Sequence, residues 1–266
     1  MKERLDILLV KKRYFDSREK ARRAIMAGLV LIDELCFDKP GTSVDVDSNI
    51  RIKGDSCPYV SRGGLKLEKS IDLWGLRLGG FTCMDIGSST GGFTDCMLKN
   101  GASKVYALDV GTNQLAYSLR TDDRVVVMEQ TNIRDIDTSE FEKLDFISID
   151  VSFISLRLVL PKASELLKTD GKIVALVKPQ FEAGREKVGK GGIVRERAVH
   201  EEVIRNVISY AEEAGLCPEG LDFSPITGAK GNIEYLMLLG KDFLHRMPDE
   251  NIKKTVAYSH SEFENK

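Results

Sequence analysis

The chain has 266 residues, of which 42% are hydrophobic and 30% are charged, and its formal net charge is −2 at pH 7. That length can hold one good core and a small second module, since domains commonly span roughly 100 to 200 residues. The opening MKERLDILLVKKRYFD is too charged for a signal peptide, and no run of about 18 apolar residues occurs. These features predict a cytoplasmic protein and argue against a membrane protein.

The first 56 residues combine helical spacing with concentrated positive charge. Residues 11–23, KKRYFDSREKARR, hold seven Lys or Arg against two acids. Leucines from Leu5 predict one helix, and a second, which Ser17 can cap and Gly28 can end, carries an alanine stripe. The segments GLVLID and NIRIKGD then alternate like short strands. This pattern predicts a small module with a basic helical face that suits phosphates, although a solvated face alone would also account for the charge.

This module resembles the small RNA-binding domain first recognised in ribosomal protein S-four. The resemblance covers roughly residues 2–56 and rests on SREKARRAIMAGLVLID. It implies docking on structured RNA, with Arg18, Lys20, Arg22 and Arg23 as inferred contacts. Further candidate RNA contacts are Arg4, Tyr59, Arg62 and Arg185.

A linker at 57–64, with Pro58 and paired glycines, is expected to lead into a second domain at 65–241. Strand and helix signals alternate there, which predicts a mostly parallel sheet with helices on both faces. The expected strands are FTCMDI, KVYALD, RVVVM, LDFISID, GKIVALVKP and NIEYLMLLG. The expected helices begin near Phe93, Gln114, Leu158 and Arg195. Residues 242–266 are interpreted as a polar tail. In such sheets ligands bind at the carboxyl ends of the strands.

The turn DIGSSTGGFT, residues 85–94, ends the first of these strands. Its glycines are Gly87, Gly91 and Gly92, which is neither the G-x-G-x-x-G spacing nor a phosphate loop. A glycine-rich turn lets the backbone approach a ligand closely, and the following helix start favours an anionic group. Asp109 ends the next strand, where a carboxylate can bind ribose hydroxyls. The turn and this acid fit an adenosyl ligand, either a dinucleotide or another adenosyl cofactor.

Four ionisable residues favour one of these options. Asp150, Lys178 and Glu234 lie at strand ends or starts, and Lys66 lies at the exit of the linker. A nicotinamide enzyme has no evident use for two lysines and two acids. An enzyme that methylates a hydroxyl group does have a use for them.

The motifs DIGSSTGGFTD, YALDVG, SIDVSFISL, LVKPQFEAGR and SRGGLKL together resemble the hemolysin A (TlyA) family of ribosomal RNA 2'-O-methyltransferases. The second domain of that family is similar to the FtsJ methyltransferases. The resemblance implies S-adenosylmethionine as cofactor, a Rossmann-like sheet of seven strands, and the catalytic set Lys66, Asp150, Lys178 and Glu234. The candidate cofactor-binding residues are Asp85, Gly87, Ser88, Ser89, Thr90, Gly91, Gly92, Phe93, Asp109, Val110, Asn132, Ile133 and Asp150.

The expected substrate is ribosomal RNA within ribosomal subunits, modified on a cytidine, and the chain is expected to act as a monomer. The three histidines, His200, His245 and His260, lack ligand spacing and the cysteines are widely spaced, so no metal site is expected. The glycine-rich, basic segment 182–200 fits either a mobile loop over the site or a plain surface loop. Two rival functions are a non-catalytic RNA-binding assembly factor and a membrane-lytic protein.

Overall fold

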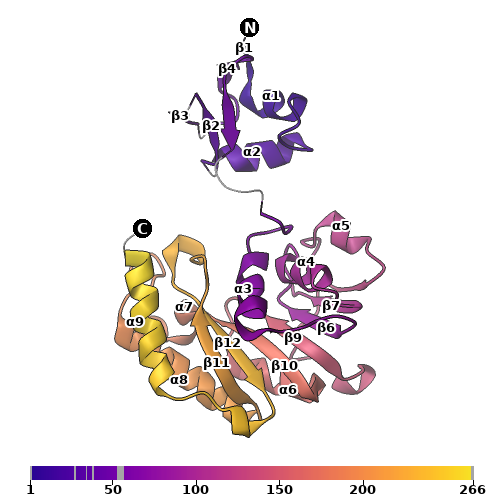
Figure 1. Ribbon diagram of the computed structural model, residues 1–266, viewed down its shortest axis with the longest axis vertical. Helices are drawn as coiled ribbons and strands as arrows, with labels where there is room; N and C mark the ends of the chain where they lie inside the picture. The colour runs from indigo at the N-terminus through magenta and orange to yellow at the C-terminus, as the bar shows by residue number, and fades with distance from the viewer. Residues whose placement is uncertain (1, 27, 34, 38, 53–56, 265–266) are drawn as a thin grey trace. The chain divides into compact units, whose positions relative to one another are not determined.

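The structure is a computed structural model that describes residues 2–26, 28–33, 35–37, 39–52 and 57–264. The chain divides into two compact units, Met1–Pro58 and Tyr59–Lys266, and both are drawn in Figure 1. The end of the expected strand NIRIKGD and the expected boundary at residue 56 fall in 53–56, outside the described residues.

The first unit contains two helices and short antiparallel strands. Its elements are β1 (Lys2–Arg4), α1 (Leu5–Lys11), α2 (Arg18–Met26), β2 (Val30–Ile32), β3 (Leu35–Cys36), β4 (Ser43–Asp45) and β5 (Ile50–Ile52). Strand β2 pairs with β3 and β5, and β1 pairs with β4. The leucines of α1 and the alanine stripe of α2 form one buried core with β2. The two helices predicted by this spacing are therefore confirmed.

The second unit is built on a seven-stranded sheet in the order β11-β12-β10-β9-β6-β7-β8. Strand β12 pairs antiparallel with β10 and β11, while the other pairs are parallel. The strands are β6 (Thr82–Ile86), β7 (Lys104–Leu108), β8 (Val125–Met128), β9 (Leu144–Ile149), β10 (Leu167–Val177), β11 (Cys217–Phe223) and β12 (Tyr235–Gly240). The prediction of a seven-stranded, mostly parallel sheet is confirmed.

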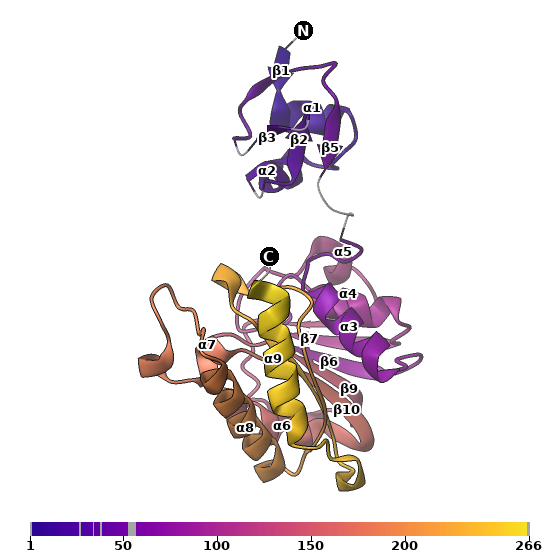
Figure 2. The same ribbon diagram turned by 60° about the vertical axis from the view of Figure 1, so that its left-hand side comes forward.

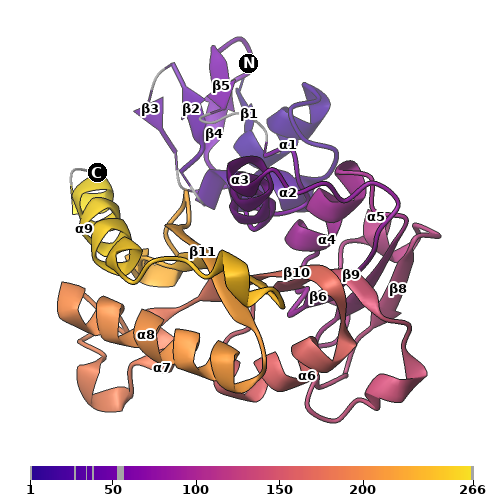
Figure 3. The same cartoon turned by 60° about the horizontal axis from the view of Figure 1, so that its bottom comes forward.

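Helices cover both faces of this sheet. The α-helices are α3 (Gly64–Trp74), α4 (Gly92–Lys99), α5 (Tyr117–Arg120), α6 (Leu160–Leu166), α7 (Pro179–Glu182), α8 (Arg197–Glu213) and α9 (Glu250–Glu264). Short 3₁₀ turns are η1 (Thr138–Glu140), η2 (Leu156–Leu158), η3 (Arg185–Lys187), η4 (Ala229–Gly231) and η5 (Phe243–His245). Figures 2 and 3 show α3 and α4 on one side of the strands and α8 and α9 on the other.

Strand β10 shows why both faces must be covered. Its side chains alternate between the two cores: Val174 and Leu176 pack with α3 and α4, whereas Ile173 and Ala175 pack with α6, α8 and α9. A strand with apolar side chains on both faces needs a helical layer on each side. The run KIVALV therefore forms an inner strand of the sheet.

Three elements differ from the sequence-based expectations. The helix expected near Gln114 begins only at Tyr117 and has four residues. Strand β11 was not recognised, because CPEGLDF contains proline, glycine and acids that are unusual in strands. Residues 242–266, interpreted as a polar tail, contain the 15-residue helix α9, whose Ile252 and Val256 are buried in the core with α8 and β11.

The register brings three strand ends to one edge of the sheet. Ile86 of β6 pairs with Ile149 of β9, and Ile149 pairs with Ala175 of β10. Antiparallel β12 starts at this same edge, since Tyr235 pairs with Val177. The residues next to these ends are therefore neighbours in space. No helix within the described ranges is long and apolar enough to span a bilayer.

Candidate active site

The turn between β6 and α4 passes very close to the end of β9. Gly87 has φ +87°, and a Cβ atom there would lie 2.5 Å from the backbone oxygen of Asp150. Only glycine tolerates both this backbone conformation and this approach. The amides of Gly87 and Ser88 donate to Leu108 O at the end of β7. The turn is therefore held against both neighbouring strands.

Asp85, at the start of the turn, bonds residues of α4 and β9. Its fully buried carboxylate accepts hydrogen bonds from the Thr94 amide (2.9 Å) and hydroxyl (2.7 Å) and from the Ser148 hydroxyl (2.9 Å). Burial raises the pKa of Asp85 to about 6. Among the proposed cofactor residues, Asp85 thus lies beneath the turn and joins the start of α4 to β9.

Asp109 ties the turn to the loop after β7. Its carboxylate accepts hydrogen bonds from the amides of Ser89 (2.8 Å) and Gly111 (2.7 Å). A carboxylate offers about four lone-pair directions, so these bonds leave acceptor capacity for ribose hydroxyls.

Glu129, which was not among the residues selected from the sequence, shapes the same loop. Its carboxylate accepts bonds from the successive amides of Asn113, Gln114 and Leu115 and from Arg120. The hydrogen bond from the Asn113 amide is the largest influence that lowers the pKa of Glu129 to about 2. A lone acid at the end of the short strand β8 carries no local signal of this role.

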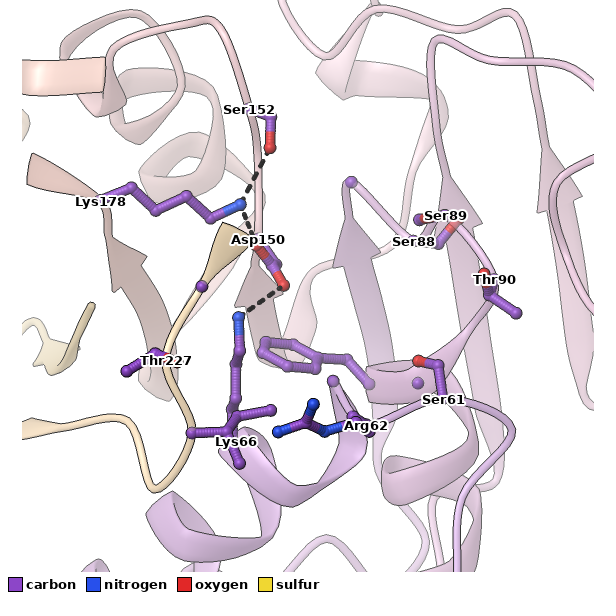
Figure 4. Close-up of a pocket in the computed structure, with 16 residues that line it drawn as sticks. Ser61, Arg62, Lys66, Ser88, Ser89, Thr90, Asp150, Ser152, Lys178 and Thr227 are labelled. Carbon is purple, nitrogen blue, oxygen red and sulfur yellow. Dashed lines mark hydrogen bonds and ion pairs between the residues drawn. The ribbon is translucent and has the colours of Figure 1, made fainter. Parts of the chain in front are cut away.

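A cavity of about 440 Å³ opens between this turn, the start of α3 and the ends of β9 and β10. Figure 4 shows Ser88, Ser89 and Thr90 facing Lys66, Asp150 and Lys178 across it. Of the residues selected from the sequence, those that line the cavity are Arg62, Lys66, Gly87, Ser88, Ser89, Thr90, Gly92, Phe93, Asp150 and Lys178. The remaining proposed cofactor-binding and catalytic residues lie outside its lining: Asp85, Gly91, Asp109, Val110, Asn132, Ile133 and Glu234.

Two lysines and two acids form one chain of ion pairs at the base of the cavity. Lys178 Nζ lies 2.6 Å from Asp150 Oδ1, and Lys66 Nζ lies 3.9 Å from Asp150 Oδ2. Lys66 Nζ also donates to Glu234 Oε2 over 2.7 Å. The side chains are at most 21% exposed, so each charge is stabilised mainly by its neighbours. The two positive charges balance the two negative ones.

Two further residues contact this cluster and were not selected from the sequence. Lys178 Nζ donates to the Ser152 hydroxyl (3.0 Å), which lines the cavity. The Gln180 amide donates to Glu234 Oε1 over 3.2 Å. Their motifs, SIDVSF and VKPQFE, hold the selected Asp150 and Lys178, and this proximity in sequence is the signal that could have found them.

The basic segment after α7 is attached beside the site. The Val194 amide donates to the Asn232 side chain (3.1 Å), and that side chain donates to Gly192 O (2.9 Å). Val194 O accepts from the His200 ring, which is fully buried in α8. Arg185, a proposed RNA contact, is exposed in η3 of this segment.

The basic face of the first unit differs from its expected form. Arg18, a proposed RNA contact, donates to Asp6 over 2.8 Å, and Arg4 binds the same buried carboxylate. Arg4 lowers the pKa of Asp6 through this hydrogen bond. Arginine near a buried acid lowers the cost of burying the charge, which the helical pattern alone does not reveal.

The other proposed RNA residues lie on exposed or anchored positions. Lys20 and Arg23 form ion pairs with Asp16 and Glu19 one turn away, and Arg22 is exposed. In the second unit, Tyr59 is partly buried and donates to Glu68, while exposed Arg62 lines the cavity.

The class of protein follows from family matches to both units. Residues 59–241 match the FtsJ-like methyltransferase family, and residues 3–50 match the S4 domain. With the seven-stranded sheet and the cavity at its carboxyl edge, these matches define an S-adenosylmethionine-dependent methyltransferase that carries an S4 domain.

Individual relatives narrow the class. The "Putative rRNA methyltransferase YqxC" of Bacillus subtilis is 51% identical over 272 residues, covering 100% of this chain and 96% of the relative. The "16S/23S rRNA (cytidine-2'-O)-methyltransferase TlyA" of Mycobacterium tuberculosis is 41% identical over 89% of each chain. A solved structure, "Putative hemolysin from Streptococcus thermophilus", has a TM-score of 0.80 and 50% identity over 99% of this chain and 98% of that one. The chain belongs to the TlyA/hemolysin A family.

The residues present suit the cofactor of this family. The cavity volume is within the range of about 300–1,000 Å³ that is usual for small-molecule sites. Gly87 and Gly92 line the cavity without side chains, and Ser88, Ser89 and Thr90, which also line it, supply hydroxyl groups. This donor set and the start of α4 suit the carboxylate of S-adenosylmethionine.

Proposed function

We propose that this protein transfers a methyl group from S-adenosylmethionine to the 2'-hydroxyl of a cytidine in ribosomal RNA, acting on ribosomal subunits in the cytoplasm as a monomer. The observation that carries the proposal is the ion-paired chain Lys178–Asp150–Lys66–Glu234 beside the glycine-rich turn. The names of the TlyA relatives support both the ribose position and the cytidine.

S-adenosylmethionine supplies an electrophilic methyl group when it is bound. We propose that the turn at residues 87–93 holds its amino-acid end and that Asp109 accepts hydrogen bonds from its ribose. Val110, Asn132 and Ile133 follow the ends of β7 and β8, where they are proposed to contact the adenine. The proposed role of Asp85 is indirect, since its carboxylate is already bonded to Thr94 and Ser148.

Lys178 is the proposed catalytic residue for the target hydroxyl. Paired with Asp150 and bonded to Ser152, its ammonium group keeps one N–H donor, which can orient the hydroxyl and stabilise the negative charge that develops on its oxygen as the hydroxyl proton is lost to water. Asp150 holds Lys178, and Glu234 holds Lys66, at the base of the cavity. Because the pairs are largely buried, this geometry is set before substrate binds.

RNA is proposed to contact both units. In the first, the exposed charges of α2 suit phosphates; in the second, exposed Arg62 lines the cavity and Arg185 is exposed in η3. Phe153, three residues after Asp150, is 89% exposed and could stack against a nucleobase.

The decisive experiment measures transfer of labelled methyl groups from S-adenosylmethionine to purified ribosomal subunits, followed by mass mapping of the modified nucleotide. We expect one or few 2'-O-methylcytidines that are absent from RNA of cells lacking the protein. Binding to subunits without transfer to any ribosomal particle would instead support a non-catalytic assembly factor.

A further inference from the structure

The short helix α7 directly follows Lys178 and contacts three parts of the site. The Gln180 side-chain amide donates to Glu234, and the centroids of the Phe181 and Phe153 rings lie 4.8 Å apart. Glu182 forms hydrogen bonds with the segment that follows β9. The Glu182 carboxylate accepts hydrogen bonds from the Ser155 hydroxyl (2.7 Å) and the Leu156 amide (2.8 Å). Helix α7 therefore fastens the loop after β9 to the end of β10.

Glu182 is an unusual carboxylate for this purpose. It is partly buried, and this burial raises its pKa. Within the described part of the chain, no Lys, Arg or His forms an ion pair with it. Burying a carboxylate without a countercharge is costly, so its two hydrogen bonds are its compensation.

The segment that Glu182 holds contains a strained residue. Phe153 has φ +63°, in the left-handed region that is unfavourable for a bulky side chain, and it is 89% exposed. Such conformations persist where surrounding contacts over-determine them. Here the contacts are the Phe181 ring on one side and the Glu182 bonds two and three residues further on. The neighbouring Ser152 accepts the hydrogen bond of Lys178 and lines the cavity.

We infer that Glu182 is a positioning residue for methyl transfer. By binding Ser155 and Leu156, it fixes residues 151–156 so that Ser152 meets Lys178 and Phe153 stays exposed beside the cavity. Glu182 lies outside the cavity lining and so acts through Ser152 and Phe153. The inference deepens the proposed function and rests on it for its kinetic consequences, whereas the conformational claim can be tested by itself.

The test compares Glu182→Ala with wild type in the full chain. We expect faster hydrogen exchange of the Leu156 amide and its neighbours, because the amide loses its acceptor. Turnover on ribosomal subunits should fall about tenfold or more, since small displacements at a reacting centre are costly to rate. The dissociation constant for S-adenosylmethionine, measured by calorimetry, should stay within about twofold, because the glycine-rich turn is held by other residues.

Two variants separate positioning from general stability. Glu182→Gln can accept from Leu156 and donate to Ser155, so it should recover most of the turnover and the slow exchange. Glu213→Ala, an exposed acid near the end of α8, is the matched control and should behave as wild type. If Glu182→Ala does not fold, Ser155→Ala removes one of the two bonds and carries the same measurements, with a smaller effect in the same direction.

Three results would overturn the inference: unchanged Leu156 exchange in Glu182→Ala, a lowered melting temperature with normal turnover, or Glu182→Gln as impaired as Glu182→Ala. A wild type that methylates no ribosomal particle would refute the proposed function instead. In that case the exchange measurement still decides whether Glu182 holds the segment.

Discussion

At the scale of single residues, Asp85 links the site to the pH dependence of stability. Burial raises its pKa to about 6, whereas in an unfolded chain it is about 3.9. Between these values the folded state keeps a proton that the unfolded state has released. The free energy of unfolding therefore falls as the pH rises through this window.

We expect the contribution of Asp85 to the free energy of unfolding to fall by up to about 3 kcal/mol between about pH 4 and pH 6, at about 1.4 kcal/mol per pKa unit. Asp85→Asn removes the titrating group, so the wild-type minus variant difference in unfolding free energy should decline across this window and be flat above it. Urea unfolding at several pH values measures that difference. A difference that does not change with pH would mean that Asp85 keeps an ordinary pKa.

Lys178 offers the sharpest test of the proposed chemistry. Lys178→Ala should lower single-turnover methyl transfer by about a hundredfold or more while RNA binding persists. Lys178→Arg should not restore it, because a planar guanidinium cannot occupy the place of the ammonium between Asp150 and Ser152.

Asp150→Ala should be as damaging as Lys178→Ala, and the double variant only slightly worse, since the pair acts as a unit. Lys253→Ala, an exposed lysine on α9, serves as control. Near-normal transfer by Lys178→Ala would rule out the proposed role.

At the scale of elements, α9 is part of the core of the second unit. Ile252 is 1% exposed and packs with α8 and the sheet. Ile252→Ala should cost about 2–5 kcal/mol of unfolding free energy, because it removes buried methylene groups and leaves a cavity. The adjacent Lys253→Ala should change it by less than about 0.5 kcal/mol. Thermal or urea unfolding measures both changes in stability. If this segment were a polar tail, both substitutions would be neutral.

At the scale of the whole molecule, the two units divide binding between them. Every residue that lines the cavity belongs to the second unit, whereas α2 belongs to the first. Arg22→Ala should therefore weaken RNA binding and reduce the slope of log affinity against log salt by roughly one, with cofactor affinity unchanged.

Asp109→Ala should weaken binding of S-adenosylmethionine by about 1–3 kcal/mol and leave the affinity for RNA unchanged. Calorimetry for the cofactor and filter binding for RNA, each over a salt series, measure both. An unaltered salt slope in Arg22→Ala would identify α2 as a solvated face.

Local pattern was enough to predict the features whose physical causes are local. Helical spacing of leucines and alanines predicted α1 and α2, and the alternation of strand and helix signals predicted a mostly parallel sheet covered by helices on both faces. The turn at residues 85–94 could be recognised because glycine is required where backbone approaches closely. Glu234 was singled out at the start of an expected strand and Lys66 at the exit of the linker, but their assignment to one catalytic set depended on the family resemblance.

Tertiary structure alone decided what depends on pairing between distant segments. Glu234 meets Lys66, 168 residues away, because β12 runs antiparallel to β10 and starts where β10 ends. Arg18 binds the buried Asp6, and α9 covers the sheet, although their sequences look like exposed polar segments. A side chain's sequence neighbours determine its helix or strand, but its charge partners and burial are set by the register and packing of the whole chain.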